Sequence, residues 1–133
     1  MADDNVIAIA SDVDVVTARQ RGRDLAERLG FSGSELTLIA TAISEVARNI
    51  LEYAKRGEIV LRAAQHGTRR GIVVIARDDG PGIPDVTLVM RDGYSTGKGL
   101  GLGLPGARRL MDEFDIFSEI GKGTTVTMKK WAG

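Results

Sequence analysis

A cluster of five glycines within ten residues constrains the fold of this chain more than any other feature, because it leads directly into a helical pattern. The glycines are Gly97, Gly99, Gly101, Gly103 and Gly106. Leucines alternate with them and favour burial, which argues against a flexible surface linker. Such a loop can fold over phosphate groups and direct backbone N–H donors at them, and the N-terminus of the following helix adds positive potential. With the added charge of Lys98, the cluster predicts a phosphate-binding loop.

Two common phosphate-binding motifs do not describe this loop. The stretch from Gly101 to Gly106 fits the spacing G-x-G-x-x-G. No strand is expected immediately before it and no βαβ unit around it, so a dinucleotide site of the Rossmann type is not supported. The pattern G-x-x-x-x-G-K-[ST] of a P-loop is absent. If this loop binds phosphates rather than acting as a surface linker, it does so in another structural context.

A second polar segment, from Asp78 to Ile83, follows the apolar stretch 72–76. A buried carboxylate at Asp78 could accept a hydrogen bond from an exocyclic amine such as that of adenine. Gly80 and Gly82 would let the backbone approach a flat base. An ordinary β-turn remains an alternative, because aspartate, glycine and proline are the residues of which turns are made.

A third segment lies in a helical pattern, where Glu45 and Asn49 stand four residues apart. Their side chains should lie about 5–6 Å from each other on one helix face, which points away from the apolar stripe of Ile39, Ile43 and Ile50. Carboxylate and amide oxygens suit Mg²⁺, which takes hard oxygen ligands. We interpret Asn49 as a metal ligand and Glu45 as a candidate general base. An exposed polar helix face is the alternative.

Length and composition limit the function classes. A chain of 133 residues is expected to form one domain over residues 1–133. The balance of 18 acidic against 18 basic side chains offers no basic field for nucleic acid, and the absence of cysteine excludes thiolate chemistry. No signal segment and no long apolar run are present. We expect a soluble, cytoplasmic protein with neither nucleic acid nor membrane as partner.

Hydrophobic periodicity and turn residues predict the order strand, helix, helix, hairpin, long loop, helix, hairpin. This order favours an α+β layer sandwich over alternating βαβ units. The expected strands are 6–10, 58–64, 71–77, 114–120 and 124–131, the expected helices are 13–29, 34–57 and 104–114, and the first hairpin turn is 65–70. The connection 78–98 is long enough to suggest a functional role, with a helical turn at 86–91.

In order and spacing, the three polar segments resemble the nucleotide-binding boxes of the family that includes DNA gyrase, the Hsp90 chaperone, sensor histidine kinases and mismatch-repair ATPases. The resemblance spans nearly the whole chain. It implies the Bergerat ATP-binding sandwich, with helices on one face of a mixed, mostly antiparallel sheet. It assigns Glu45 and Asn49 to the asparagine box, Asp78, Gly80 and Gly82 to the first glycine box, Gly99, Gly101 and Gly103 to the second, and Thr124 to a final element near the base.

Within that family, the segments 42–50, 93–96 and 103–114 look most like the stand-alone serine/threonine kinases of bacterial partner-switching systems. That resemblance implies phosphorylation of STAS-domain scaffold and antagonist proteins of the stressosome, followed by activation of a PP2C-type phosphatase. ATP and Mg²⁺ would be the cofactors. Asn49 would hold Mg²⁺, the glycine loop with Lys98 would stabilise phosphate charge, and Glu45 would take the proton of the attacking hydroxyl.

Two other classes of function remain open on the sequence. One is an anti-sigma factor of the same fold, which sequesters a sigma factor and phosphorylates its antagonist. The other binds ATP without catalysis and uses it to select a partner, although a carboxylate at Glu45 argues against this class. The only histidine, His66, lies in an expected turn, so a histidine phosphoacceptor has little support.

Overall fold

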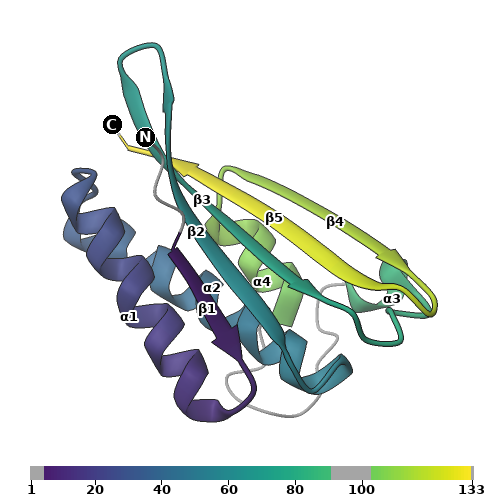
Figure 1. The fold of residues 1–133 in the computed structure, drawn as a ribbon. Helices are drawn as coiled ribbons and strands as arrows, with labels where there is room; N and C mark the ends of the chain where they lie inside the picture. The colour runs from purple at the N-terminus through teal and green to yellow at the C-terminus, as the bar shows by residue number, and fades with distance from the viewer. Residues whose placement is uncertain (1–4, 91–102, 133) are drawn as a thin grey trace.

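The chain folds into two layers, a sheet and a set of helices that cover one of its faces (Figure 1). This computed structural model describes residues 5–90 and 103–132. In chain order the elements are β1 (Asn5–Ile9), α1 (Asp12–Arg28), α2 (Gly33–Tyr53), β2 (Gly57–His66), β3 (Arg69–Asp78), α3 (Val86–Val89), α4 (Gly103–Leu110), β4 (Glu113–Glu119) and β5 (Gly123–Trp131).

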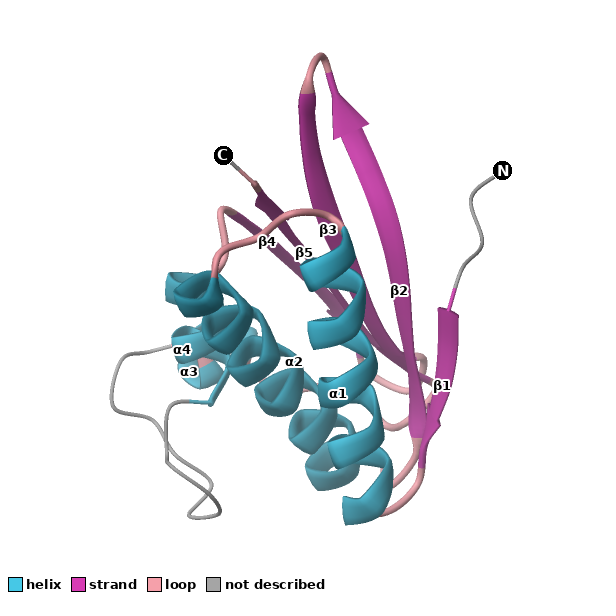
Figure 2. Ribbon diagram, turned by 90° about the vertical axis from the view of Figure 1, so that its left-hand side faces the viewer, coloured by secondary structure: helices cyan, strands magenta, loops and turns pink. Residues whose placement is uncertain are grey.

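The sheet has the strand order β1-β2-β3-β5-β4. Figure 2 shows the helices on one side of the sheet, with α2 between α1 and α4. The expected α+β sandwich with helices on one face is confirmed. The sheet was expected to be mixed and mostly antiparallel, and every pairing within the described residues is antiparallel.

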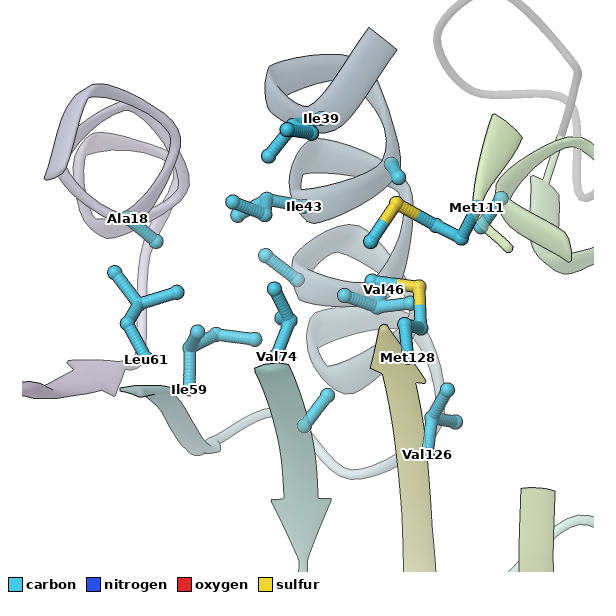
Figure 3. Close-up of a cluster of buried hydrophobic side chains, with 14 of the residues drawn as sticks. Ala18, Ile39, Ile43, Val46, Ile59, Leu61, Val74, Met111, Val126 and Met128 are labelled. Atoms are coloured by element: carbon cyan, nitrogen blue, oxygen red, sulfur yellow. The ribbon is translucent and has the colours of Figure 1, made fainter. Parts of the chain in front are cut away.

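The core lies where α2 packs on the middle of the sheet, because α2 repeats large apolar residues at helical spacing. Ile39, Ile43 and Val46 point from α2 toward Leu61 and Val74 on the strands (Figure 3). All five side chains are buried. The apolar stripe that the sequence predicted for this helix is therefore the stripe that holds the two layers together.

Both long helices begin as the sequence indicates. Ser32 and Glu35 form a capping box before α2, in which the Glu35 amide donates to Ser32 Oγ at 3.3 Å. The sequence interpretation extended α2 to residue 57 with Lys55 and Arg56 as its last cations, and this is wrong. The helix ends at Tyr53, and Lys55 adopts a left-handed conformation with φ of 70°. Among the described helices, none is both long and apolar enough to cross a membrane.

The first hairpin turn is tighter than the six residues expected. Gln65 pairs with Arg70 and His66 with Arg69, so two residues remain in the turn. Polar side chains suggested a turn there, but β2 and β3 extend beyond the helices into solvent, where polar residues suit a strand. These two residue pairs therefore extend β2 and β3 beyond the hydrophobic core.

The helix expected to run to residue 114 ends at Leu110. The Asp112 amide donates to the Lys129 carbonyl at 2.9 Å, and Phe114 pairs with Met128 in the sheet. Pairing with β5 therefore overrides the helical spacing of residues 111–114.

We expect Ile43→Ala to lower the free energy of unfolding by about 2–5 kcal/mol, because it leaves a cavity among fully buried side chains. Ile120→Ala is the matched control, because Ile120 is 71% exposed and its loss should change stability by about 0.5 kcal/mol or less. Urea unfolding of both variants measures the difference. Equal losses at the two positions would contradict the assignment of Ile43 to the core.

Candidate functional site

At one end of the sheet, three polar side chains occupy positions that the core would otherwise fill. Asp78 on β3 lies opposite Thr124 on β5, and Thr124 lies opposite Ser118 on β4. Directly opposed residues of antiparallel strands share a face. The next row inward is apolar, with Ala76, Val126 and Ile116 in the same register. The helix-facing side of the sheet thus changes from apolar to polar at this row.

The carboxylate of Asp78 is only 9% exposed at the end of β3. Burial raises its pKa above the ordinary value of 3.8, and hydrogen bonds from the backbone of Gly80 and Thr124 act in the opposite direction. The Gly80 amide donates to Asp78 Oδ1 at 2.9 Å. A buried acceptor of this kind suits a neutral N–H donor such as an exocyclic amine.

The loop after Asp78 is held against the turn between β4 and β5. Gly121 donates its amide to the Pro81 carbonyl at 2.8 Å, and Ile83 donates its amide to Ser118 Oγ at 2.7 Å. Gly82 has φ of +82°, and a Cβ there would lie 2.5 Å from the Glu119 carbonyl oxygen. Only glycine fits this approach, so the first glycine segment is fixed in place by backbone contacts.

Glu45 is 6% exposed on the face of α2 that packs against α4. Its Oε1 accepts a hydrogen bond from the Gly103 amide at 3.1 Å, and its Oε2 lies 3.5 Å from Arg48 Nη1. The alternative of an exposed polar helix face is therefore wrong for Glu45. The carboxylate lies at the N-terminus of α4, where the helix dipole favours negative charge.

Asn49 follows on the same helix, four residues after Glu45, and is half-buried. Its amide oxygen fits a magnesium ion that arrives with a nucleotide, because Mg²⁺ keeps several waters and needs only one or two protein oxygens. Within residues 5–90 and 103–132, no cluster of three or more His, Cys, Asp or Glu side chains is present. Gly103 begins α4, while the expected positions of Lys98, Gly99 and Gly101 lie outside the described residues.

A hollow of about 630 Å³ adjoins the polar row. Its lining includes Asp78 and Thr124, together with Arg77, Phe117 and Glu58, which alternate with the core-facing residues and so belong to the outer face of the sheet. Glu45 and Asn49 do not line this hollow. The hollow and the face of α2 with Glu45 are therefore two different places in the structure.

Sequence reasoning brought together Glu45, Asn49, Asp78 and Thr124 but missed Ser118. A signal for Ser118 exists in the alternation of β4. Phe114 and Ile116 pack against the core, and Ser118 occupies the next position of the same face. A polar residue in an inward position at the end of a strand marks a candidate site.

Comparison with known proteins shows that the chain belongs to one family. The profile of the histidine kinase-like ATPase domain matches residues 9–130. The chain is 48% identical over 131 residues to the serine/threonine-protein kinase RsbT of Bacillus subtilis (strain 168), with 98% of each chain covered. It is 34% identical over 105 residues to the anti-sigma F factor of Thermoanaerobacter sp. (strain X514), covering 74% of this chain and 72% of that protein.

A solved structure supports the same fold. The RsbU and RsbW domains of Rv1364c from Mycobacterium tuberculosis match with a TM-score of 0.61 and 24% sequence identity. The match covers 98% of this chain and 32% of that chain. This likeness concerns the arrangement of the helices and strands.

We expect Asp78→Asn to stabilise the nucleotide-free protein at neutral pH. A carboxyl whose pKa is raised by folding contributes most to stability below its ordinary value of 3.8, and that contribution is lost as pH rises through the folded pKa. The advantage of Asp78→Asn should therefore grow as the pH rises from 3.8 through the folded pKa of Asp78, as measured by urea unfolding. Asp115→Asn, at an exposed position, is the control. A difference that does not depend on pH would contradict the burial of a titrating Asp78.

Proposed function

Because the chain belongs to the histidine kinase-like ATPase domain family and is a partner-switching protein serine/threonine kinase, we propose that it phosphorylates STAS-domain scaffold and antagonist proteins of a stressosome. After phosphate transfer, the kinase leaves its substrate and binds and activates a PP2C-type phosphatase. The similarity to RsbT over 98% of both chains supports this assignment more than the shorter similarity to anti-sigma F factors.

ATP lies between the polar row and the start of α4 in this proposal. Its exocyclic amine donates to the buried carboxylate of Asp78, beside Thr124. Gly80 and Gly82 keep the backbone of this segment packed at the base end of the site, because a Cβ at either position would meet Ala54 or Glu119. The phosphates lie at the N-terminus of α4, covered by the loop that contains Lys98, Gly99, Gly101 and Gly103.

Magnesium would be held by the amide oxygen of Asn49 and would neutralise charge on the phosphates. Asn49 is one helical turn from Glu45, so a metal on Asn49 lies near the same phosphates that α4 faces. The protein supplies one oxygen ligand from a rigid helix, and the remaining ligands come from phosphate and water.

The proton of the attacking serine or threonine hydroxyl goes to Glu45. One observation carries this step: the buried Glu45 carboxylate is fixed at the first residue of α4 by the Gly103 amide. A general base must be held within hydrogen-bond reach of the proton that it removes. Oε2 is the oxygen for that proton, because Oε1 already accepts from Gly103 at 3.1 Å while Oε2 lies at the longer distance of 3.5 Å from Arg48.

The experiment is phosphate transfer from Mg-ATP to a purified STAS-domain protein, followed by intact mass. We expect one phosphate on a serine or threonine of the STAS protein. Glu45→Gln should lower kcat by about 10²–10⁴-fold, because the amide keeps the acceptor for Gly103 but cannot take a proton. Glu52→Gln, an exposed position on the same helix, should transfer at the normal rate. No transfer by a wild-type protein that binds ATP would contradict the kinase–STAS proposal, and normal transfer by Glu45→Gln would contradict the assignment of the base.

Asn49→Ala should abolish the dependence of ATP affinity on magnesium, because it removes the protein oxygen that holds the metal. Titration calorimetry with and without Mg²⁺ measures this dependence. Asn49→Asp keeps an oxygen at the position and should retain a response to Mg²⁺. An unchanged magnesium effect in Asn49→Ala would rule out the proposed ligand.

The similarity to anti-sigma F factors supports a second candidate, in which the chain sequesters a sigma factor and phosphorylates the antagonist of that complex. Both candidates transfer phosphate to an antagonist, so binding to a sigma factor is the measurement that separates the two. A sigma factor that binds the chain with ATP, and is released when a STAS antagonist is added, would favour the anti-sigma class.

A further inference from the structure

We propose that Ser118 is a positioning residue for base recognition, through which the hydroxyl of Thr124 is oriented toward the nucleotide. The inference rests on the proposed ATP site and adds a residue that none of the nucleotide-binding segments contains. Ser118 lies on β4, an edge strand, and reaches the site only through its neighbours.

The Ser118 hydroxyl joins three separate backbone segments. It accepts a hydrogen bond from the Ile83 amide at 2.7 Å, on the far side of the first glycine segment. It lies 2.7 Å from Thr124 Oγ1 and 3.3 Å from the Gly123 carbonyl oxygen. One side chain thus ties the loop after β3 to the start of β5.

The number of protons on these hydroxyls restricts the network. A serine hydroxyl has one proton to donate and two lone pairs, and the Ile83 amide uses one lone pair. In one arrangement Ser118 donates to Thr124 Oγ1, and the proton of Thr124 is then free for a ligand. In the other, Thr124 donates to Ser118 and Ser118 donates to the Gly123 carbonyl, so Thr124 can only accept from a ligand.

The edge of adenine fits the arrangement in which Ser118 donates to Thr124. This edge presents an amine, which donates a hydrogen bond, next to a ring nitrogen, which accepts one. Asp78 accepts from the amine, and Thr124 directly opposite Asp78 on the next strand can donate to the ring nitrogen. Thr124 is free to do so because Ser118 supplies the proton that satisfies its oxygen. Ser118 therefore sets the donor and acceptor pattern that matches adenine.

A base with the reverse pattern gives a direct contrast. The hypoxanthine of inosine triphosphate (ITP) presents an oxygen acceptor beside a ring N–H donor, so a Thr124 that donates to the ring position has no partner there. We expect the wild-type protein to bind ATP more tightly than ITP. Loss of the Ser118 hydroxyl should affect the nucleotide that uses the oriented Thr124 and spare the one that does not.

The test is equilibrium binding of ATP and ITP, each with Mg²⁺, to the full chain. In Ser118→Ala, the Kd for ATP should rise on the order of tenfold, while the Kd for ITP changes less than about twofold. Ser118→Thr, which keeps the hydroxyl, should restore the preference for ATP. Thr127→Val removes a hydroxyl from the opposite face of β5 and is the matched control, with both affinities unchanged.

The outcomes distinguish a failure of this inference from a failure of the proposed function. A parallel loss of ATP and ITP affinity in Ser118→Ala would mean that Ser118 only supports the fold, and would overturn the proposal. An unchanged ATP preference in Ser118→Ala would overturn it as well. A wild-type chain that binds neither nucleotide would instead overturn the proposed function itself, and binding is measured without any need for phosphate transfer.

Discussion

The packing of α2 on both the sheet and α4 is the constraint on which the rest of the structure depends. One face of α2 buries Ile39, Ile43 and Ile50 against the strands, and a second face buries Glu45 and Ala42 toward α4. Glu45 would be costly to bury without a partner, and the Gly103 amide supplies one. A buried carboxylate therefore fixes where α4 begins, and with it the point at which the glycine-rich loop meets the fold.

A comparable constraint acts at the other end of the site. The turn between β4 and β5 approaches the loop after β3 so closely that Gly82 and Gly123 have no room for a side chain. This approach aligns Asp78, Thr124 and Ser118 as neighbours across three strands. In the proposed site, backbone packing sets the base end, while a contact between α2 and α4 sets the phosphate end.

Much of this arrangement could be predicted from sequence, because it rests on local patterns. Helical spacing located α1 and α2, alternation located the strands, and the segment 78–83 was placed correctly after a buried strand. The errors have physical causes. Polar residues on strands that extend past the helices resemble a turn, as at Gln65 and Arg70, and sheet pairing ended α4 before Phe114 despite its helical spacing.

The burial of Glu45 and the contacts of Ser118 could not be predicted from local sequence patterns. Glu45 is buried by α4, whose first residue, Gly103, lies 58 positions later in the chain. The residues near Glu45 in the sequence give no signal of that contact. Ser118 acts through Thr124, which the strand register brings opposite it, and through Ile83, which the loop after β3 brings to it. The roles of Lys98, Gly99 and Gly101 stay predictions, as does the metal role of Asn49.

The most direct test of the nucleotide site is a crystal structure with a non-hydrolysable ATP analogue and Mg²⁺. We expect the exocyclic amine within hydrogen-bond distance of Asp78, the ring nitrogen beside Thr124, and the metal on Asn49 with the phosphates toward Gly103. A nucleotide found instead against Arg77 and Phe117 on the outer face of the sheet, with its base away from Asp78 and Thr124, would contradict the proposed site.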